Sequence, residues 1–341
     1  MSANATQNTT KSDQNRTEPV KLKDIQAPIA DSLLEFRTYF RKAVKSDVFL
    51  LDQLVGYLLK TKGKELRPAL VFHTARICGG INERTYIAAT MIELLHTATL
   101  IHDDVVDEAD ERRGLLSINY IWKNKASVLL GDFLLAKGLL VALNRNEFGL
   151  LKVVSEAVRK MSEGELRQLK ASKLQNMTEE RYFKVISEKT ASLISACCEC
   201  GAVSATDDEA QHVALRNFGE NLGIAFQVRD DLFDYGTDDA GKPAANDIKE
   251  RKMTLPFIYA LSRVPFFKRR SMRQLYKKKN KSEAEINAII AFVQENDGIR
   301  YAHAKMQEYT RKARENLQVF PVSAERSTLE SFLDFVVTRK K

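Results

Sequence analysis

HTATLIHDDVVD, residues 96–107, and FQVRDDLFD, residues 226–234, are two stretches of the chain with the same arrangement of aspartates. In each, the spacing DDxxD lies beside apolar residues, and on a helix the first and last aspartates lie one turn apart on one face. Like charges so placed destabilise a bare helix, so the pattern indicates that a cation offsets them. Oxygen ligands favour a hard cation, and we expect Mg²⁺. The expected ligands are Asp103, Asp104, Asp107, Asp230, Asp231 and Asp234.

The repetition of the motif decides between two interpretations. One acidic stretch alone is readily explained as the ordinary end of a helix. Two of them, each late in an apolar helix, can face each other across a helical bundle and hold metal ions between them. Because Mg²⁺ prefers a few carboxylates completed by phosphate oxygens, the pair predicts a diphosphate substrate.

Composition predicts an all-α fold. The chain of 341 residues has 15 Gly and 7 Pro, too few turn formers for an all-β protein with many tight hairpins. Helical periodicity continues from residue 20 to the end, without a repeat or a linker, so we expect one catalytic domain over 20–341. Residues 1–19 are polar and are expected to form a disordered tail.

Charge and cysteine content limit the environment of the protein. A net charge of +8 suggests anionic partners. We expect the four cysteines to be reduced and buried, because their spacing fits neither a disulfide framework nor a zinc site. No uninterrupted run of about 18 apolar residues is present, so no transmembrane helix is expected. The N-terminus lacks an apolar signal segment, and a cytoplasmic location is the expectation.

Several basic residues are candidates for binding a diphosphate. Arg112 and Arg113 follow the first motif directly, and arginine pairs grip phosphate oxygens in bidentate fashion. For each lysine alone, a solvated surface role is the more common one. The remaining candidates are Lys64, Arg67, Lys189, Lys242 and Lys252.

These motifs together resemble the trans-isoprenyl diphosphate synthase (polyprenyl synthetase) family, over nearly the whole chain after the tail. In order they are GKxxRP at 63–68, the first DDxxD with RRG at 112–114, Lys189-Thr190, Gln227 with the second DDxxD, and the GK…D…KxTLP run from Gly241 to Pro256. The chain departs from the family pattern at three places. Lys62 replaces a usual Gly, Glu65 replaces a usual Arg, and Ala245 replaces a usual Gly.

The resemblance implies a helical bundle of the isoprenoid synthase type with a central cavity, a homodimer, and two diphosphate subsites. The aspartates would hold Mg²⁺ on the allylic diphosphate. Thr190 and Gln227 would lie beside the ionising allylic carbon. The allylic diphosphate would contact Arg112, Lys189, Lys242 and Lys252, and isopentenyl diphosphate would contact Lys64, Arg67, His96 and Arg113.

The residues before the first motif predict product length. In the family, an aromatic four or five positions before the first aspartate closes the tunnel for the growing chain. Here these positions are Thr99 and Ala98, both small, which predicts a long all-trans product of the kind used in quinone side chains. A short-chain farnesyl or geranylgeranyl diphosphate synthase is the alternative.

Three further alternatives stay open on the residues alone. A class I terpene cyclase would not need Lys64, Arg67 or Arg113. A non-catalytic synthase subunit is expected to lose aspartates. A nucleic-acid-binding role is disfavoured, because the aspartates would repel phosphate. The basic segment 266–281, FFKRRSMRQLYKKKNK, is either a solvated helix and loop, as such runs usually are, or a patch for an anionic membrane or nucleic acid. A peripheral membrane contact there would serve product release.

Overall fold

In the computed structural model, the described residues are 20–60, 63–107, 111–112, 115–174, 176–236 and 245–339. The predicted tail, 1–19, lies outside them. The helices are α1 Leu22–Gln26, α2 Ala30–Ala43, α3 Phe49–Lys60, α4 Leu66–Ile77, α5 Glu83–Val106, α6 Ile118–Leu143, α7 Phe148–Leu174, α8 Glu179–Ile186, α9 Ser192–Ala205, α10 Glu209–Phe233, α11 Asn246–Glu250, α12 Leu255–Ser262, α13 Phe266–Lys277, α14 Glu283–Glu295, α15 Gly298–Asn316 and α16 Ala324–Thr338. Short 3₁₀ turns occur at Ala27–Ile29 and Leu317–Val319, and a π-helical turn at Ser187–Ala191.

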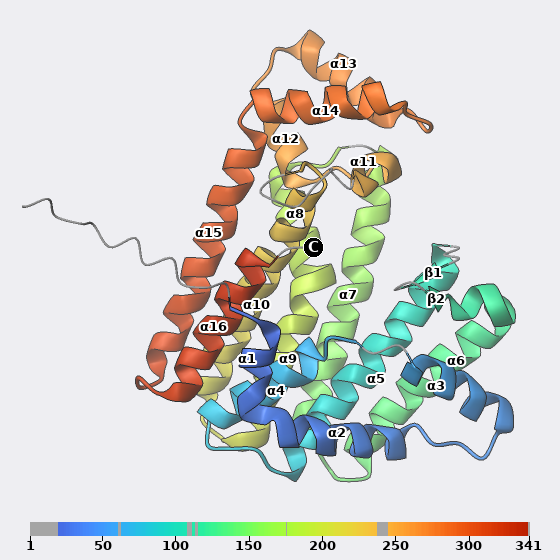
Figure 1. Cartoon of the computed structure of the whole chain (residues 1–341), viewed down its shortest axis with the longest axis vertical. Helices are drawn as coiled ribbons and strands as arrows, with labels where there is room; N and C mark the ends of the chain where they lie inside the picture. The colour runs from blue at the N-terminus through green and yellow to red at the C-terminus, as the bar shows by residue number, and fades with distance from the viewer. Residues whose placement is uncertain are drawn as a thin grey trace, which may run out of the picture.

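Two long helices that end in the aspartate motifs form the frame of the bundle. α5 begins at the capping residue Asn82, whose side chain accepts from the Thr85 N–H, and it is buried around most of its circumference. α5 packs on α6, α4 and α9, and α10 packs on α9 and α15. In Figure 1, α15 lies on the left of the bundle and α5 and α6 on the right.

Small residues bring the central helix α9 close to α4. A Cβ at Gly201 would overlap the Val71 carbonyl oxygen and the Thr74 hydroxyl. The cysteines are free and buried, as predicted, and burial raises the pKa of Cys197 to about 12. These thiols therefore serve as small apolar residues of the core.

The all-α prediction is confirmed, with one local difference. Strand β1, Glu111–Arg112, pairs antiparallel with β2, Leu115–Leu116, and forms a small hairpin between α5 and α6. The sequence interpretation expected no strand there. Each strand has only two residues, too few to show the alternation by which strands are recognised.

Helix α6 is more apolar than the sequence analysis expected. Among the described residues, α6 is a helix long and apolar enough to cross a membrane, judged by length and composition only. About a third of its most apolar 18-residue window is buried inside the protein. Asp132 and Lys137 interrupt the apolar run, which is why no span was predicted, but the mean hydropathy stays high. One side of α6 packs on α5, and another side exposes apolar residues such as Leu129 and Leu140.

Candidate active site

The first aspartate motif forms the C-terminal end of α5. Asp107 caps the helix, and its N–H donates to the Asp103 carbonyl at 2.8 Å. Asp104 is buried, Asp103 is half-buried and Asp107 is exposed. The three carboxylates thus differ in burial within one helical turn.

The second motif ends α10 and lies deeper. Asp231 accepts hydrogen bonds from the Tyr182 hydroxyl at 2.5 Å and from Gln227 Nε2 at 2.8 Å. Gln227 accepts in turn from the Thr190 hydroxyl at 2.9 Å. Burial raises the pKa of Asp231 to about 8, and the nearby Asp247 carboxylate adds to the shift. The structure therefore brings Thr190, Gln227 and Asp231 into one hydrogen-bonded chain, in which Tyr182 was not predicted.

Helix α11 brings a further carboxylate to the second motif. The Asp247 N–H donates to the Asp234 carboxylate. Burial and the charge of Asp234 raise the pKa of Asp247 to about 6. The residue before α11, Ala245, has a φ of 52°, in the left-handed region that favours glycine. The departure from the family glycine therefore puts backbone strain at the start of α11.

Lys252 connects the neighbourhoods of the two motifs. Its ammonium lies 2.5 Å from a Glu250 carboxylate oxygen. Burial opposes the charged ammonium, but the hydrogen bond with Glu250 and the charges of Asp247 and Asp107 raise the pKa of Lys252. Asp107 belongs to the first motif and the Asp247 N–H donates to the second, so charges from both neighbourhoods favour the ammonium of Lys252.

The predicted Lys189 lies on the π-helical turn between α8 and α9. Its Nζ pairs with Glu165 on α7 at 2.5 Å. Gly164 allows α7 to approach the turn this closely, because a Cβ at position 164 would lie 2.8 Å from both the backbone nitrogen of Lys189 and the Cβ of Glu188. Such turns inside helices are frequent at functional sites. No role was predicted for Gly164 or Glu165 from the sequence.

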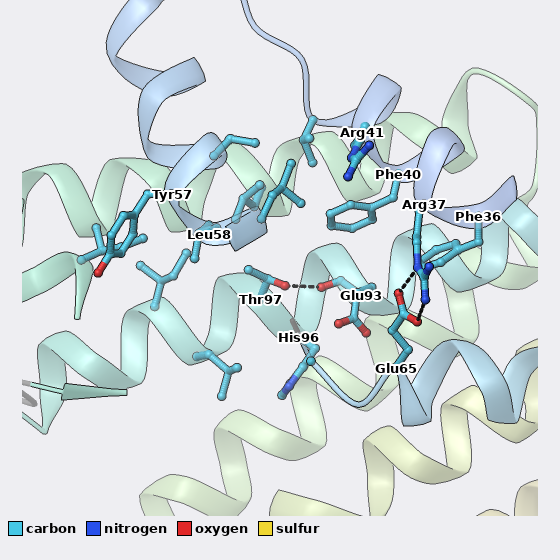
Figure 2. Close-up of a pocket in the computed structure, with 18 of the residues that line it drawn as sticks. Phe36, Arg37, Phe40, Arg41, Tyr57, Leu58, Glu65, Glu93, His96 and Thr97 are labelled. Atoms are coloured by element: carbon cyan, nitrogen blue, oxygen red, sulfur yellow. Dashed lines mark hydrogen bonds and ion pairs between the residues drawn. The ribbon is translucent and has the colours of Figure 1, made fainter. Parts of the chain in front are cut away.

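A pocket of about 520 Å³ opens between α2, α3 and α5. In Figure 2, Glu93, His96 and Thr97 lie on the α5 side of the pocket, with Phe40 and Tyr57 opposite. His96 is buried at this wall. Asp104, about two turns further along α5, lines the same pocket. The pocket thus joins the first motif to an apolar interior.

The loop before α4 carries Lys64 and Arg67. Lys64 is exposed, and its carbonyl accepts from Gln26 Nε2 at 2.9 Å. Arg67 is half-buried in the first turn of α4. Glu65, one of the departures from the family pattern, accepts both hydrogen bonds of the Arg37 guanidinium, at 2.7 and 2.8 Å (Figure 2). The sequence analysis noticed Glu65 but not its partner on α2.

The two residues expected to control chain length lie on another face of α5. Ala98 is buried among apolar side chains between α5 and α6, including Leu94 and Leu130. The Thr99 hydroxyl donates to the His96 carbonyl at 2.8 Å. Ala98 shares this cluster with Ile101, and Ile101 lines the pocket. Ala98 therefore lies behind the pocket wall and does not line the pocket itself.

Some predicted residues fall outside what the structure describes. Arg113 and Lys242 are not among the described residues, and Arg112 is described only through its backbone in β1. Their proposed contacts with diphosphate therefore stay predictions.

The donors present suit a divalent cation. Among the described residues, no three His, Cys, Asp or Glu side chains already converge on one metal position. Mg²⁺ commonly takes only one or two carboxylates and completes its shell with water and phosphate oxygens. The raised pKa values of Asp231 and Asp247 mark an excess of buried negative charge, which a bound cation would relieve. The ligands would be the six aspartates of the two motifs.

The chain was compared with known proteins. A family model described as polyprenyl synthetase matches residues 48–293. An all-trans-nonaprenyl-diphosphate synthase (geranyl-diphosphate specific) of Rhodobacter capsulatus is 34% identical, covering 93% of this chain and 97% of the relative. A decaprenyl diphosphate synthase structure from Rhodobacter capsulatus has a TM-score of 0.88 at 31% identity, covering 94% of this chain and 100% of that chain. A polyprenyl synthase structure from Caulobacter crescentus CB15, complexed with calcium and isoprenyl diphosphate, has a TM-score of 0.86 at 33% identity, covering 95% of this chain and 100% of that chain.

Proposed function

Because the chain belongs to the polyprenyl synthetase family, we propose that it condenses isopentenyl diphosphate repeatedly with an allylic diphosphate to give a long all-trans-polyprenyl diphosphate. The observation that carries this proposal is the pair of aspartate motifs ending α5 and α10. The charges of Asp107 in the first motif and of Asp247, whose N–H donates to Asp234 of the second, both contribute to the raised pKa of Lys252. A prenyl transfer needs this arrangement, because a diphosphate must be held and released between the two helices.

The reaction breaks the allylic C–O bond and forms a C–C bond to the double bond of isopentenyl diphosphate. A proton is then lost to the departed diphosphate. Bound Mg²⁺ would supply the Lewis acid that neutralises the leaving group. Lys189 and Lys252 stabilise the departing charge electrostatically, together with Arg112 and Lys242. The oxygens of Thr190 and Gln227 provide dipoles beside the allylic carbon.

The second substrate lies on the other side of the first motif. Lys64, Arg67, His96 and Arg113 would bind isopentenyl diphosphate and hold its double bond against the allylic carbon. Holding the two reactants in this geometry makes the condensation effectively intramolecular. The apolar walls of the pocket beside His96 keep water from the allylic cation.

The relatives support a long product, since their names refer to nonaprenyl and decaprenyl diphosphates. In this chain no aromatic ring stands at position 98 or 99 of α5. The growing chain can then pass beyond the first motif, and quinone side chains are the proposed end use.

We further propose a homodimer formed through α6. Its exposed apolar residues lie opposite the side that packs on α5, and burying them between two copies explains the high hydropathy of this helix without a membrane. The exposed residues include Ile121, Val128, Leu129, Leu139 and Leu140. Light scattering should show a dimer at micromolar concentration, and a monomer would refute this interface.

We also propose that the enzyme is cytoplasmic and that a peripheral membrane contact releases its product. α13 lies at one end of the molecule, beside α14 (Figure 1). Phe266 and Phe267 are exposed at its start, and the segment 266–281 has basic residues and no acidic one. Such a helix suits an anionic bilayer. Cosedimentation with anionic but not neutral vesicles would support the contact, and binding to neither would refute it.

The catalytic proposal is tested with Asp103→Asn. Farnesyl and isopentenyl diphosphates at saturating Mg²⁺ should give long polyprenyl diphosphates with the wild type. The variant should lose orders of magnitude in turnover while its thermal unfolding stays unchanged, because ionisation loses a metal ligand. Asp52→Asn, at an exposed position on α3, is the matched control. Normal turnover of Asp103→Asn, or a cyclised hydrocarbon product, would refute the proposal.

A further inference from the structure

A cation from the chain itself lies at the second aspartate motif. Arg339, the residue after the last turn of α16, forms an ion pair with Asp230. Its guanidinium lies 4.1 Å from the ring centroid of Phe226 and 5.7 Å from that of Phe233. The Arg339 side chain is only 15% exposed, against 38% for Asp230. The guanidinium is thus enclosed by a carboxylate and two aromatic rings, which together make a cation site.

The fold holds the backbone of Arg339 beside this site. The Arg339 N–H donates to the Phe335 carbonyl at 2.9 Å and so caps α16. Arg229 Nη2 donates to the Arg339 carbonyl at 3.2 Å. Val336, one turn earlier, is buried in the main core. Because the backbone is fixed on both sides, the guanidinium can leave Asp230 by rotation of the side chain alone, while α16 stays in place.

The guanidinium and a metal ion compete for the same carboxylate. A charge-assisted pair with Arg339 occupies Oδ1 of Asp230, an oxygen that a metal would use, and two cations on one carboxylate repel each other. We propose that Arg339 occupies Asp230 in place of the metal, so that a metal ion binds at Asp230 only after this side chain has turned away. This inference rests on the proposed function, which makes Asp230 a metal ligand.

The competition has a defined effect on metal loading. A ligand that binds only one of two states loses apparent affinity in proportion to the population of the other state. Arg339 thereby raises the metal concentration that the second motif requires. It also compensates the charge of Asp230 in the metal-free protein, where other buried carboxylates are close by.

The experiment measures Mg²⁺ binding to the full chain by titration calorimetry, without substrate. Arg339→Gln should bind Mg²⁺ about fivefold more tightly than the wild type, the change expected when a modest ion pair no longer competes. Arg339→Lys, which keeps the charge, should stay closer to the wild type. Arg314→Gln is the matched control. Arg314 pairs with Asp334 on α16 at 2.6 Å, so this substitution removes a different ion pair of α16.

Two results would overturn the inference. The first is unchanged or weaker Mg²⁺ binding in a folded Arg339→Gln protein, and the second is equal tightening in Arg339→Gln and Arg339→Lys. Asp230→Asn separates this inference from the proposed function. If that variant loses Mg²⁺ affinity while Arg339→Gln is unchanged, only the role of Arg339 fails. If Asp230→Asn binds Mg²⁺ as the wild type does, the assignment of Asp230 as a metal ligand fails with it.

Discussion

Replacing Gly164 by alanine tests how α7 supports the π-helical turn. The added Cβ would lie 2.8 Å from the backbone nitrogen of Lys189 and 2.8 Å from the Cβ of Glu188. Neither atom is the far end of a flexible side chain, so the backbone of α7 or of the turn must shift. Overpacking of this kind costs about 1–3 kcal/mol. Alanine regains about 1 kcal/mol of helix propensity, which leaves a net loss of roughly 0–2 kcal/mol.

The effect on activity should exceed the effect on stability. Lys189 and Thr190 lie on the turn that must move, and a 1 Å misplacement of a catalytic group can cost about a hundredfold in rate. A shift of a few tenths of an ångström should therefore lower turnover roughly tenfold. Urea unfolding followed by circular dichroism measures the first effect, and prenyl transfer at saturating substrates measures the second.

Gly149→Ala is the matched control on the same helix. Its Cβ would lie 3.5 Å from Val203 Cγ1, an ordinary van der Waals contact. The control should be neutral or gain at most about 1 kcal/mol, with normal turnover. If Gly164→Ala behaves like this control in both assays, the close contact between α7 and the π-helical turn does not exist as described.

Two further predictions concern the acid limb of stability and the length of the product. Burial lowers the pKa of His73 from about 6.5 to about 4. The contribution of the neutral ring to the free energy of unfolding is therefore complete above about pH 6.5. This contribution, at most about 3 kcal/mol, is lost as pH falls toward 4. His73→Gln should flatten that limb of urea midpoint against pH, and parallel curves for the two proteins would contradict this. Ala98→Phe should shift products to the farnesyl or geranylgeranyl class, because the ring would enter the apolar cluster beside the pocket. Chromatography of the products decides the point, and an unchanged length distribution would count against a role for Ala98.

The helical bundle and the aspartate motifs were predictable because they depend on local spacing. The period of apolar residues gives helices, and DDxxD puts carboxylates on one face wherever a helix forms. Partners from distant helices were not predictable in this way. Nothing in the sequence near Asp231 points to Tyr182, which is 49 residues away, and nothing near Glu65 points to Arg37.

Conformations off the regular pattern were also missed. The π-helical turn at Ser187–Ala191 lies against Gly164, a contact between two helices that no local pattern shows. The left-handed Ala245 opposes its own residue preference, and it lies two residues before Asp247, whose N–H donates to Asp234. Tertiary contacts decided these positions.

The ion pair between Arg37 and Glu65 limits how this protein can be recombined with its relatives. The loop at 63–68 carries an acidic residue, Glu65, where the family pattern used in the sequence analysis has an arginine, and its partner guanidinium comes from α2, 28 residues earlier. The loop is therefore not an exchangeable module by itself. A chimera that receives this loop without α2 would carry an uncompensated carboxylate beside the proposed isopentenyl diphosphate subsite. A chimera that receives both segments would keep the charge balance, so the natural unit of exchange begins at Ala30 rather than at Gly63.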